Sequence, residues 1–173
     1  MHSAPKLADS PIEARRTADL TEFTWIDADT FDRGLRAYVT AVARALGVGE
    51  ESSTVDSTVP ASAYLALDGT PPAFPDRELA LLWDERHGWA AAVETHSGGD
   101  LLVLGYLDPA HGATPPPRVL VRFVDALRAG RSVGRADPPD LPGLDRRHAG
   151  VVLAERYLES WSDNAHGGGN TLS

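Results

Sequence analysis

The stretch from Ser62 to Gly130 constrains the fold most strongly, because four short apolar segments separated by turn residues are followed there by three prolines and an amphipathic segment. The loops after the second and third apolar segments span only 84–88 and 97–100, too short for the crossover that parallel neighbours need. We therefore expect an antiparallel meander. Its four strands are predicted at residues 63–67, 78–83, 89–95 and 101–107.

Amphipathic segments lie on both sides of this predicted sheet. Before it, apolar residues recur at helical spacing from Phe31 to Leu46, with an N-cap at Asp29 and Gly47 as the terminating residue. Residues 49–60 are rich in Ser, Thr, Asp and Glu and are expected to form an irregular loop. After the sheet, residues 119–127 predict a second helix that ends at Gly130. The chain is thus predicted to be an α+β domain with the order α-β-β-β-β-α.

The polar ends of the chain set the expected limits of this domain at residues 29–130. Residues 1–28 contain few side chains that can be buried, so this N-terminal arm is expected to be mobile. Residues 131–148 form a linker rich in Pro, Asp and Arg. Beyond the linker, a narrow apolar stripe fits an additional C-terminal helix over 149–162, and the rest of the segment 131–173 is expected to be a disordered tail. The stripe consists of Val152, Leu153, Tyr157, Leu158 and Trp161.

Two of the predicted strands are apolar on both faces. In the second strand Leu79, Leu81 and Trp83 alternate with two further apolar residues, and the strand at 101–107 is similarly continuous. Such runs are typical of strands covered on both faces, and leaving three or four large side chains bare would cost about 1.5 to 3 kcal/mol each. The two helices can cover one face. The other face is therefore left to the additional helix, to a second copy of the chain or to a partner.

Charge and composition restrict the partners and the location. The chain has 25 acidic and 16 basic residues and a net charge of −9, which repels phosphate backbones and anionic lipids. We therefore expect neither a nucleic acid nor a membrane as partner. The chain has no cysteine, and its N-terminus lacks the apolar segment of a signal peptide, so a cytoplasmic location is expected.

The sequence contains none of the common catalytic or cofactor motifs. The six histidines form neither an HExxH pattern nor a helical i, i+4 pair that could bind a metal. There is no G-x-S-x-G, no P-loop and no dinucleotide-binding fingerprint. We accordingly predict no catalytic residue, no cofactor and no metal.

One hairpin loop concentrates side chains that suit contact with a ligand. Residues 84–88 place two carboxylates, a guanidinium and an imidazole between two tryptophans, types that are useful in acid–base chemistry and at binding hot spots. The alternative interpretation is that Asp84 and Gly88 only form the turn and that the residues between them are solvated charges. The candidate contact residues are Trp83, Asp84, Glu85, Arg86, His87 and Trp89.

Three segments carry a family resemblance: A-S-A-Y-L-A-L-D at 61–68, L-L-W-D-E-R-H-G-W at 81–89 and A-V-E-T at 92–95. They resemble a family of uncharacterised actinobacterial proteins, a domain of unknown function in which the 81–89 segment is the most distinctive stretch. The resemblance covers about residues 31–130 and leaves both tails outside. It implies domain limits, and it brings no activity, cofactor or catalytic residue.

The sequence favours a non-enzymatic protein-binding or regulatory module, whose partner is another protein or a second copy of the chain. The acidic composition, the doubly apolar strands and the lack of catalytic motifs motivate this hypothesis. One alternative is a small enzyme or ligand-binding protein that uses Asp84, Glu85 and His87 in the 84–88 loop. A second alternative is an acidic antagonist of a basic partner, such as a toxin or a nucleic-acid-binding protein, and it follows from net charge alone.

Overall fold

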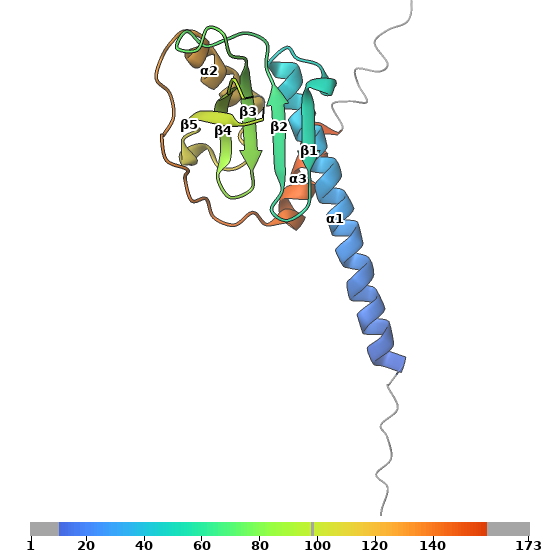
Figure 1. Cartoon of the computed structure of the whole chain (residues 1–173). Coiled ribbons are helices and arrows are strands. Elements are labelled where there is room, and N and C mark those ends of the chain that lie inside the picture. Colours follow the sequence, from blue (N-terminus) through green and yellow to red (C-terminus); the bar gives the residue numbers. More distant parts are fainter. Residues whose placement is uncertain (1–10, 98, 159–173) are drawn as a thin grey trace, which may run out of the picture.

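Five antiparallel strands form a single sheet in the computed structural model, which describes the backbone of residues 11–97 and 99–158 and the side chains from residue 27 onward within these ranges (Figure 1). The spatial order of the strands is their order in the sequence, β1-β2-β3-β4-β5. The α+β class and the antiparallel meander are therefore confirmed. The strands are β1 (Ser53–Asp56), β2 (Ser62–Ala66), β3 (Leu79–Asp84), β4 (Gly88–Glu94) and β5 (Leu101–Tyr106).

The prediction of four strands was wrong, because β1 lies in the segment that was expected to be an irregular loop. β1 is an edge strand of sequence S-T-V-D and pairs with β2, with Ser53 opposite Leu65 and Asp56 opposite Ser62. Only its Val55 packs against the core. A half-exposed edge strand needs few apolar residues, so its sequence does not show the apolar pattern on which strand prediction depends.

The helices are α1 (Pro11–Ala45), α2 (Pro117–Arg128) and α3 (Arg146–Tyr157), with short 3₁₀ turns η1 (Glu50–Ser52) and η2 (Pro109–His111). The expected helix start at Asp29 was wrong: Asp29 lies inside α1, where it pairs with Arg33 one turn later. α2 begins at a proline, as its fixed φ favours, and Gly130 follows its end with a φ of 75°. α3 begins at Arg146 instead of residue 149, and the predicted residues 159–162 of this helix lie outside the described part. The mobility of the N-terminal arm stays a prediction.

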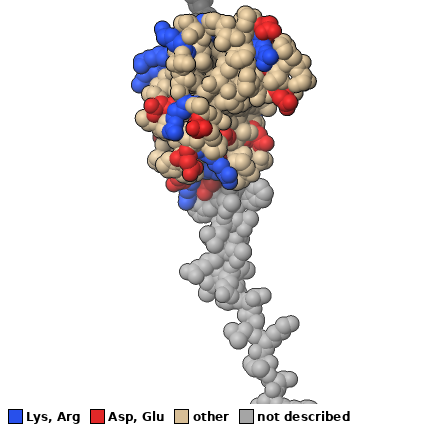
Figure 2. Space-filling view, turned by 60° about the vertical axis from the view of Figure 1, so that its left-hand side comes forward, with Lys and Arg blue, Asp and Glu red and all other residues tan. Residues whose placement is uncertain are grey.

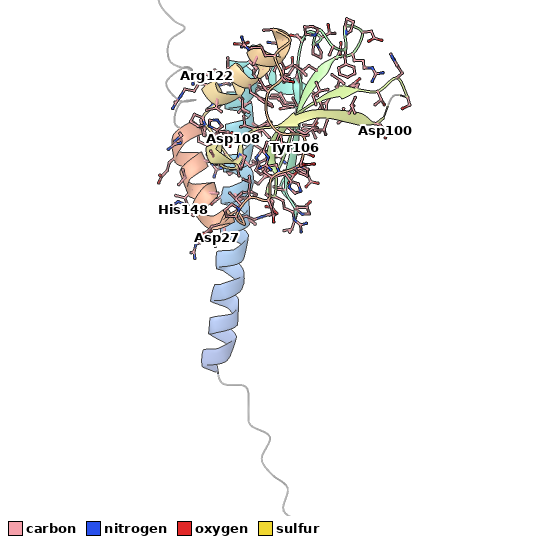
Figure 3. All side chains as sticks on the ribbon, turned by 90° about the vertical axis from the view of Figure 1, so that its left-hand side faces the viewer. Asp27, Asp100, Tyr106, Asp108, Arg122 and His148 are labelled. Atoms are coloured by element: carbon pink, nitrogen blue, oxygen red, sulfur yellow. The ribbon has the colours of Figure 1, made fainter. Side chains whose placement is uncertain are left out.

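All three helices lie on one side of the sheet (Figures 1 and 3). α3 packs against α1, and the two helices approach most closely at Gly34 and Gly150. A Cβ atom at Gly34 would lie 2.6 Å from the Gly150 carbonyl oxygen, so only glycine permits this approach. The additional helix therefore does not cover the second face of the sheet. That face carries no helix within the described residues.

The core between sheet and helices contains the two tryptophans that flank the hairpin. Trp83 and Trp89 are opposite each other in β3 and β4, and both are buried. The Trp83 indole donates to the carbonyl oxygen of Ala113 (2.7 Å), and the Trp89 indole donates to the Tyr38 hydroxyl (3.0 Å). Tyr38 in turn donates to the Pro115 carbonyl oxygen (2.6 Å). These bonds join β3, β4 and α1 to the loop before α2.

Candidate functional site

The hairpin loop at 84–88, the site suggested by the sequence, is built into internal contacts. The Asp84 carboxylate accepts hydrogen bonds from the backbone N–H groups of Arg86 (2.8 Å) and His87 (2.9 Å), and Gly88 has a φ of 70°. His87 Nδ1 lies 2.9 Å from the Pro139 carbonyl oxygen. The loop therefore forms the expected turn, and it also holds the linker that precedes α3.

Glu85 has the most elaborate contact in this loop. Its carboxylate pairs with Arg146 at the start of α3 at 2.9 Å, and the two side chains are only 14% and 28% exposed. Arg146 also donates to the carbonyl oxygens of Ser57 (2.9 Å) and Thr58 (3.0 Å), and its guanidinium stacks 4.8 Å from the Phe31 ring centre. A single arginine thus joins the hairpin, the loop after β1 and two helices.

The six candidate contact residues do not converge on a cavity that the structure shows. Both tryptophans lie in the core, while Glu85 and His87 have partners within the chain. Arg86 is the member with an exposed side chain. Contact between this loop and a partner stays a prediction. Within residues 27–97 and 99–158, no group of three His, Asp or Glu side chains is arranged to hold a metal ion.

The uncovered side of the sheet, which we call the open face, is the second candidate site. Two rows of residues run across it in register on β2, β3, β4 and β5. Ala80, Ala90 and Ala92 form its floor and are 1%, 4% and 0% exposed, although no helix lies above them. The larger side chains beside them are half-buried and shield them. The rows are Tyr64, Leu82, Ala90 and Tyr106, and Ala66, Ala80, Ala92 and Val103.

An acidic hollow lies at one end of the open face. It has a volume of about 240 Å³ and is lined by Tyr64, Glu94, Asp100 and Leu101, among others. The Tyr64 hydroxyl donates to Glu94 Oε1 at 3.3 Å. Burial raises the pKa of Tyr64, and the nearby Glu94 carboxylate adds to this shift. Sequence reasoning missed the hollow, because strand register decides which residues of β2, β4 and β5 meet.

A comparison with models of protein families finds a match to this chain. Neither a curated protein nor a solved structure matches the chain. In the described part, no helix combines the length and apolar composition needed to cross a membrane. The family model of DUF6292 matches residues 38–126, which include every strand of the sheet and lie within the range 31–130 expected from the resemblance. The chain therefore belongs to DUF6292, a family of unknown function.

Proposed function

We propose that the protein is a non-enzymatic protein-binding module whose open face receives a partner segment that carries a basic side chain beside apolar ones. The observation that supports the proposal is the open face itself, an apolar sheet surface with no helix over it in the described part of the chain. Contiguous apolar surfaces of this kind mark interaction sites in monomeric proteins.

The composition of the open face suits a protein partner. A partner would contact the half-buried Tyr64, Leu82 and Val103, because these larger side chains shield the alanine floor. Tyr64 and Tyr106 supply large amphipathic rings on either side of this floor, and tyrosine is enriched at binding hot spots. The face therefore offers shape and apolar area without a catalytic group at its centre.

Charge complementarity defines the partner more narrowly. The acidic hollow places the carboxylates of Glu94 and Asp100 beside the apolar Leu101, which is 37% exposed. An arginine or lysine can lay its aliphatic stem on such a residue and direct its charge toward the carboxylates. The net charge of −9 adds long-range attraction for a basic partner. The acidic-antagonist hypothesis and the binding-module hypothesis therefore lead to the same surface.

Site-specific photo-crosslinking tests this proposal in cells that produce the protein. A photoreactive phenylalanine replaces Tyr64 or Val103 on the open face, and the matched control replaces the exposed Arg118 on α2. We expect one identified protein to be crosslinked from both open-face positions and not from the control. Equal crosslinking from residue 118 would contradict the proposed surface. Crosslinking to a second copy of the chain would show that the open face mediates self-association and does not bind a different protein.

Binding of the purified partner then tests the role of charge. Glu94→Arg should weaken binding by at least about tenfold, and added salt should weaken binding of the wild type. Glu155→Arg makes the same charge change at an exposed position on α3 and is expected to have little effect. Equal losses from both variants, or an affinity that is insensitive to salt, would refute the proposed recognition of a basic side chain.

The proposal includes a cytoplasmic location and an actinobacterial origin. The absence of cysteine is compatible with a cytoplasmic protein, and the resemblance of the 81–89 segment supports an actinobacterial origin. Fluorescence microscopy of a tagged chain tests the location. A survey of sources and of residues 81–89 across DUF6292 tests the origin and whether this segment is distinctive for the family.

A further inference from the structure

A separate hollow lies on the helical side of the sheet, between the end of β5, η2 and α2. Its volume is about 330 Å³. Leu107, Val119 and Phe123 give it apolar walls, and its polar lining comes from Asp108, His111, Arg122 and Arg135. Arg122 on α2 lies above Asp108 in Figure 3. We call this hollow the arginine pocket.

The walls of the arginine pocket are held in place before any ligand binds. Tyr106 and Arg135 exchange two backbone hydrogen bonds of 2.8 Å, which attach the segment 133–135 to the end of β5. Gly134 has a φ of 77°, and a Cβ atom there would lie 3.2 Å from the Phe123 ring, so this backbone runs close to α2. The Asp108 carboxylate accepts from the N–H of Ala110 (2.9 Å) and closes η2. Preformed walls reduce the entropy that a ligand must overcome.

The charge of the pocket differs from that of the whole protein. Residues 118–135 contain five arginines and one aspartate, in a chain with a net charge of −9. Figure 2, turned toward this side of the molecule, shows neighbouring basic side chains at the upper left and mixed charges below. An excess of arginine beside an apolar hollow in an acidic protein indicates attraction of an anion.

The two pocket arginines have no ionic partner within residues 27–97 and 99–158. By contrast, Arg36 pairs with Asp32, and Arg146 pairs with Glu85. The carboxylate of Asp108 already caps η2, so it does not neutralise the pocket by a direct ion pair in the described structure. The guanidinium groups of Arg122 and Arg135 are consequently available to a ligand.

We propose that the arginine pocket binds a small organic anion. Its carboxylate or phosphate group contacts Arg122 and Arg135, and a short apolar part lies against Val119 and Phe123. Guanidinium groups bind both kinds of oxyanion with paired hydrogen bonds, which explains why arginine suits this position. The pocket lies on the side of the sheet away from the open face, so this proposal is independent of the protein-binding function.

Titration of the full chain, labelled with ¹⁵N, tests the site with defined probes. Benzoate represents an apolar carboxylate, phenyl phosphate represents an apolar phosphate, and benzylammonium has a similar shape with a positive charge. We expect saturable amide shifts at residues 107–111, 119–123 and 134–135 with at least one anion. The anion that binds with the higher affinity identifies the preferred head group. Shifts with benzylammonium of equal size, shifts centred elsewhere, or no saturable shift with either anion would overturn the proposal.

Substitutions of arginine show whether the pocket or the general charge attracts the anion. Arg122→Gln and Arg135→Gln should each weaken binding of the preferred anion by about tenfold, which corresponds to about 1.4 kcal/mol. Arg118→Gln, one turn before Arg122 on α2, and Arg131→Gln remove the same charge outside the pocket and should change affinity less than about twofold. Equal losses from all four variants would show that the anion is attracted only by the field of the segment, which would refute a defined site.

Discussion

Replacement of Tyr38 by phenylalanine tests the hydrogen-bonded chain that joins the core to the loop before α2. The Tyr38 hydroxyl accepts from the Trp89 indole at 3.0 Å and donates to the Pro115 carbonyl oxygen at 2.6 Å. Tyr38 and Trp89 are 0% and 1% exposed. Without the hydroxyl, an indole N–H and a carbonyl oxygen lose their partner in the core. Each buried group left without a partner costs about 1 to 3 kcal/mol, so Tyr38→Phe should lower the free energy of unfolding by about 2 to 6 kcal/mol.

Urea unfolding followed by circular dichroism measures this loss, and Tyr64→Phe is the matched control. Tyr64 loses a hydroxyl that lies on the half-exposed open face and donates to Glu94 at the longer distance of 3.3 Å. Its loss should be less than about 0.5 kcal/mol, because water replaces the partner. A loss at Tyr38 that is no larger than the loss at Tyr64 would refute the reasoning that burial makes the Tyr38 bonds important.

The same substitution should change the stability of the protein at high pH. Burial strongly raises the pKa of Tyr38, so the folded state keeps its proton where the unfolded chain, with the ordinary tyrosine pKa of about 10, loses it. The stabilisation is therefore complete below pH 10 and is lost as the pH rises above that value, by up to about 1.4 kcal/mol per pH unit. Tyr38→Phe removes this contribution. Identical slopes of unfolding free energy against pH for the wild type and the variant, between pH 10 and 11, would contradict it.

Three further substitutions test contacts made by α1 and α3. Gly150→Ala places a Cβ atom 2.9 Å from the backbone of α1 and should lower the free energy of unfolding by about 1 to 3 kcal/mol, whereas Gly143→Ala, with open space around it, should be nearly neutral in the same urea titration. Glu85→Gln removes the charge that pairs with the half-buried Arg146 and should lower the free energy of unfolding by about 1 to 2 kcal/mol. If this difference does not shrink as salt is added, its cause is not the ion pair. The hydrogen bond from Arg36 holds the pKa of Asp32 below its ordinary value. The ionised Asp32 therefore stabilises the fold above about pH 4, and this stabilisation is lost as the pH falls through the lowered pKa. Asp32→Asn should flatten the acid limb of the curve of unfolding free energy against pH, and an unchanged acid limb would exclude this contribution.

The sequence by itself determined those features of the protein that depend on neighbouring residues. Short loops at 84–88 and 97–100 allow only an antiparallel connection, and Gly88 supplies the positive φ of the hairpin turn. The helical spacing before Gly130 identifies α2 and its end. In each case the turn residues or the spacing of apolar residues within a short segment is sufficient to predict the element. The α+β class and the antiparallel meander followed from these local patterns.

The candidate sites could not be predicted from local patterns, because they are formed by contacts between residues far apart in the sequence. Glu85 and Arg146 are 61 positions apart, and their pairing turned a loop that resembled a solvated tip into the attachment point of α3. The five arginines of residues 118–135 are visible in the sequence, but the sequence does not show that Arg122 and Arg135 line one hollow. The relation of this segment to the hollow depended on the bridge between Tyr106 and Arg135.

Only the tertiary structure decided which face of the sheet the helices cover. The apolar runs in β3 and β5 predict cover on both faces, because a sequence pattern counts apolar residues on a strand without showing their surroundings. Ala80, Ala90 and Ala92 are buried by larger side chains on the adjacent strands, so a sheet face can shield its own centre without a helix above it. The polar edge strand β1 shows the reverse case, since pairing with β2 makes a strand of residues that have little strand pattern of their own. Burial and pairing are properties of the assembled sheet, and they depend on strand register and on the packing of α3 against α1.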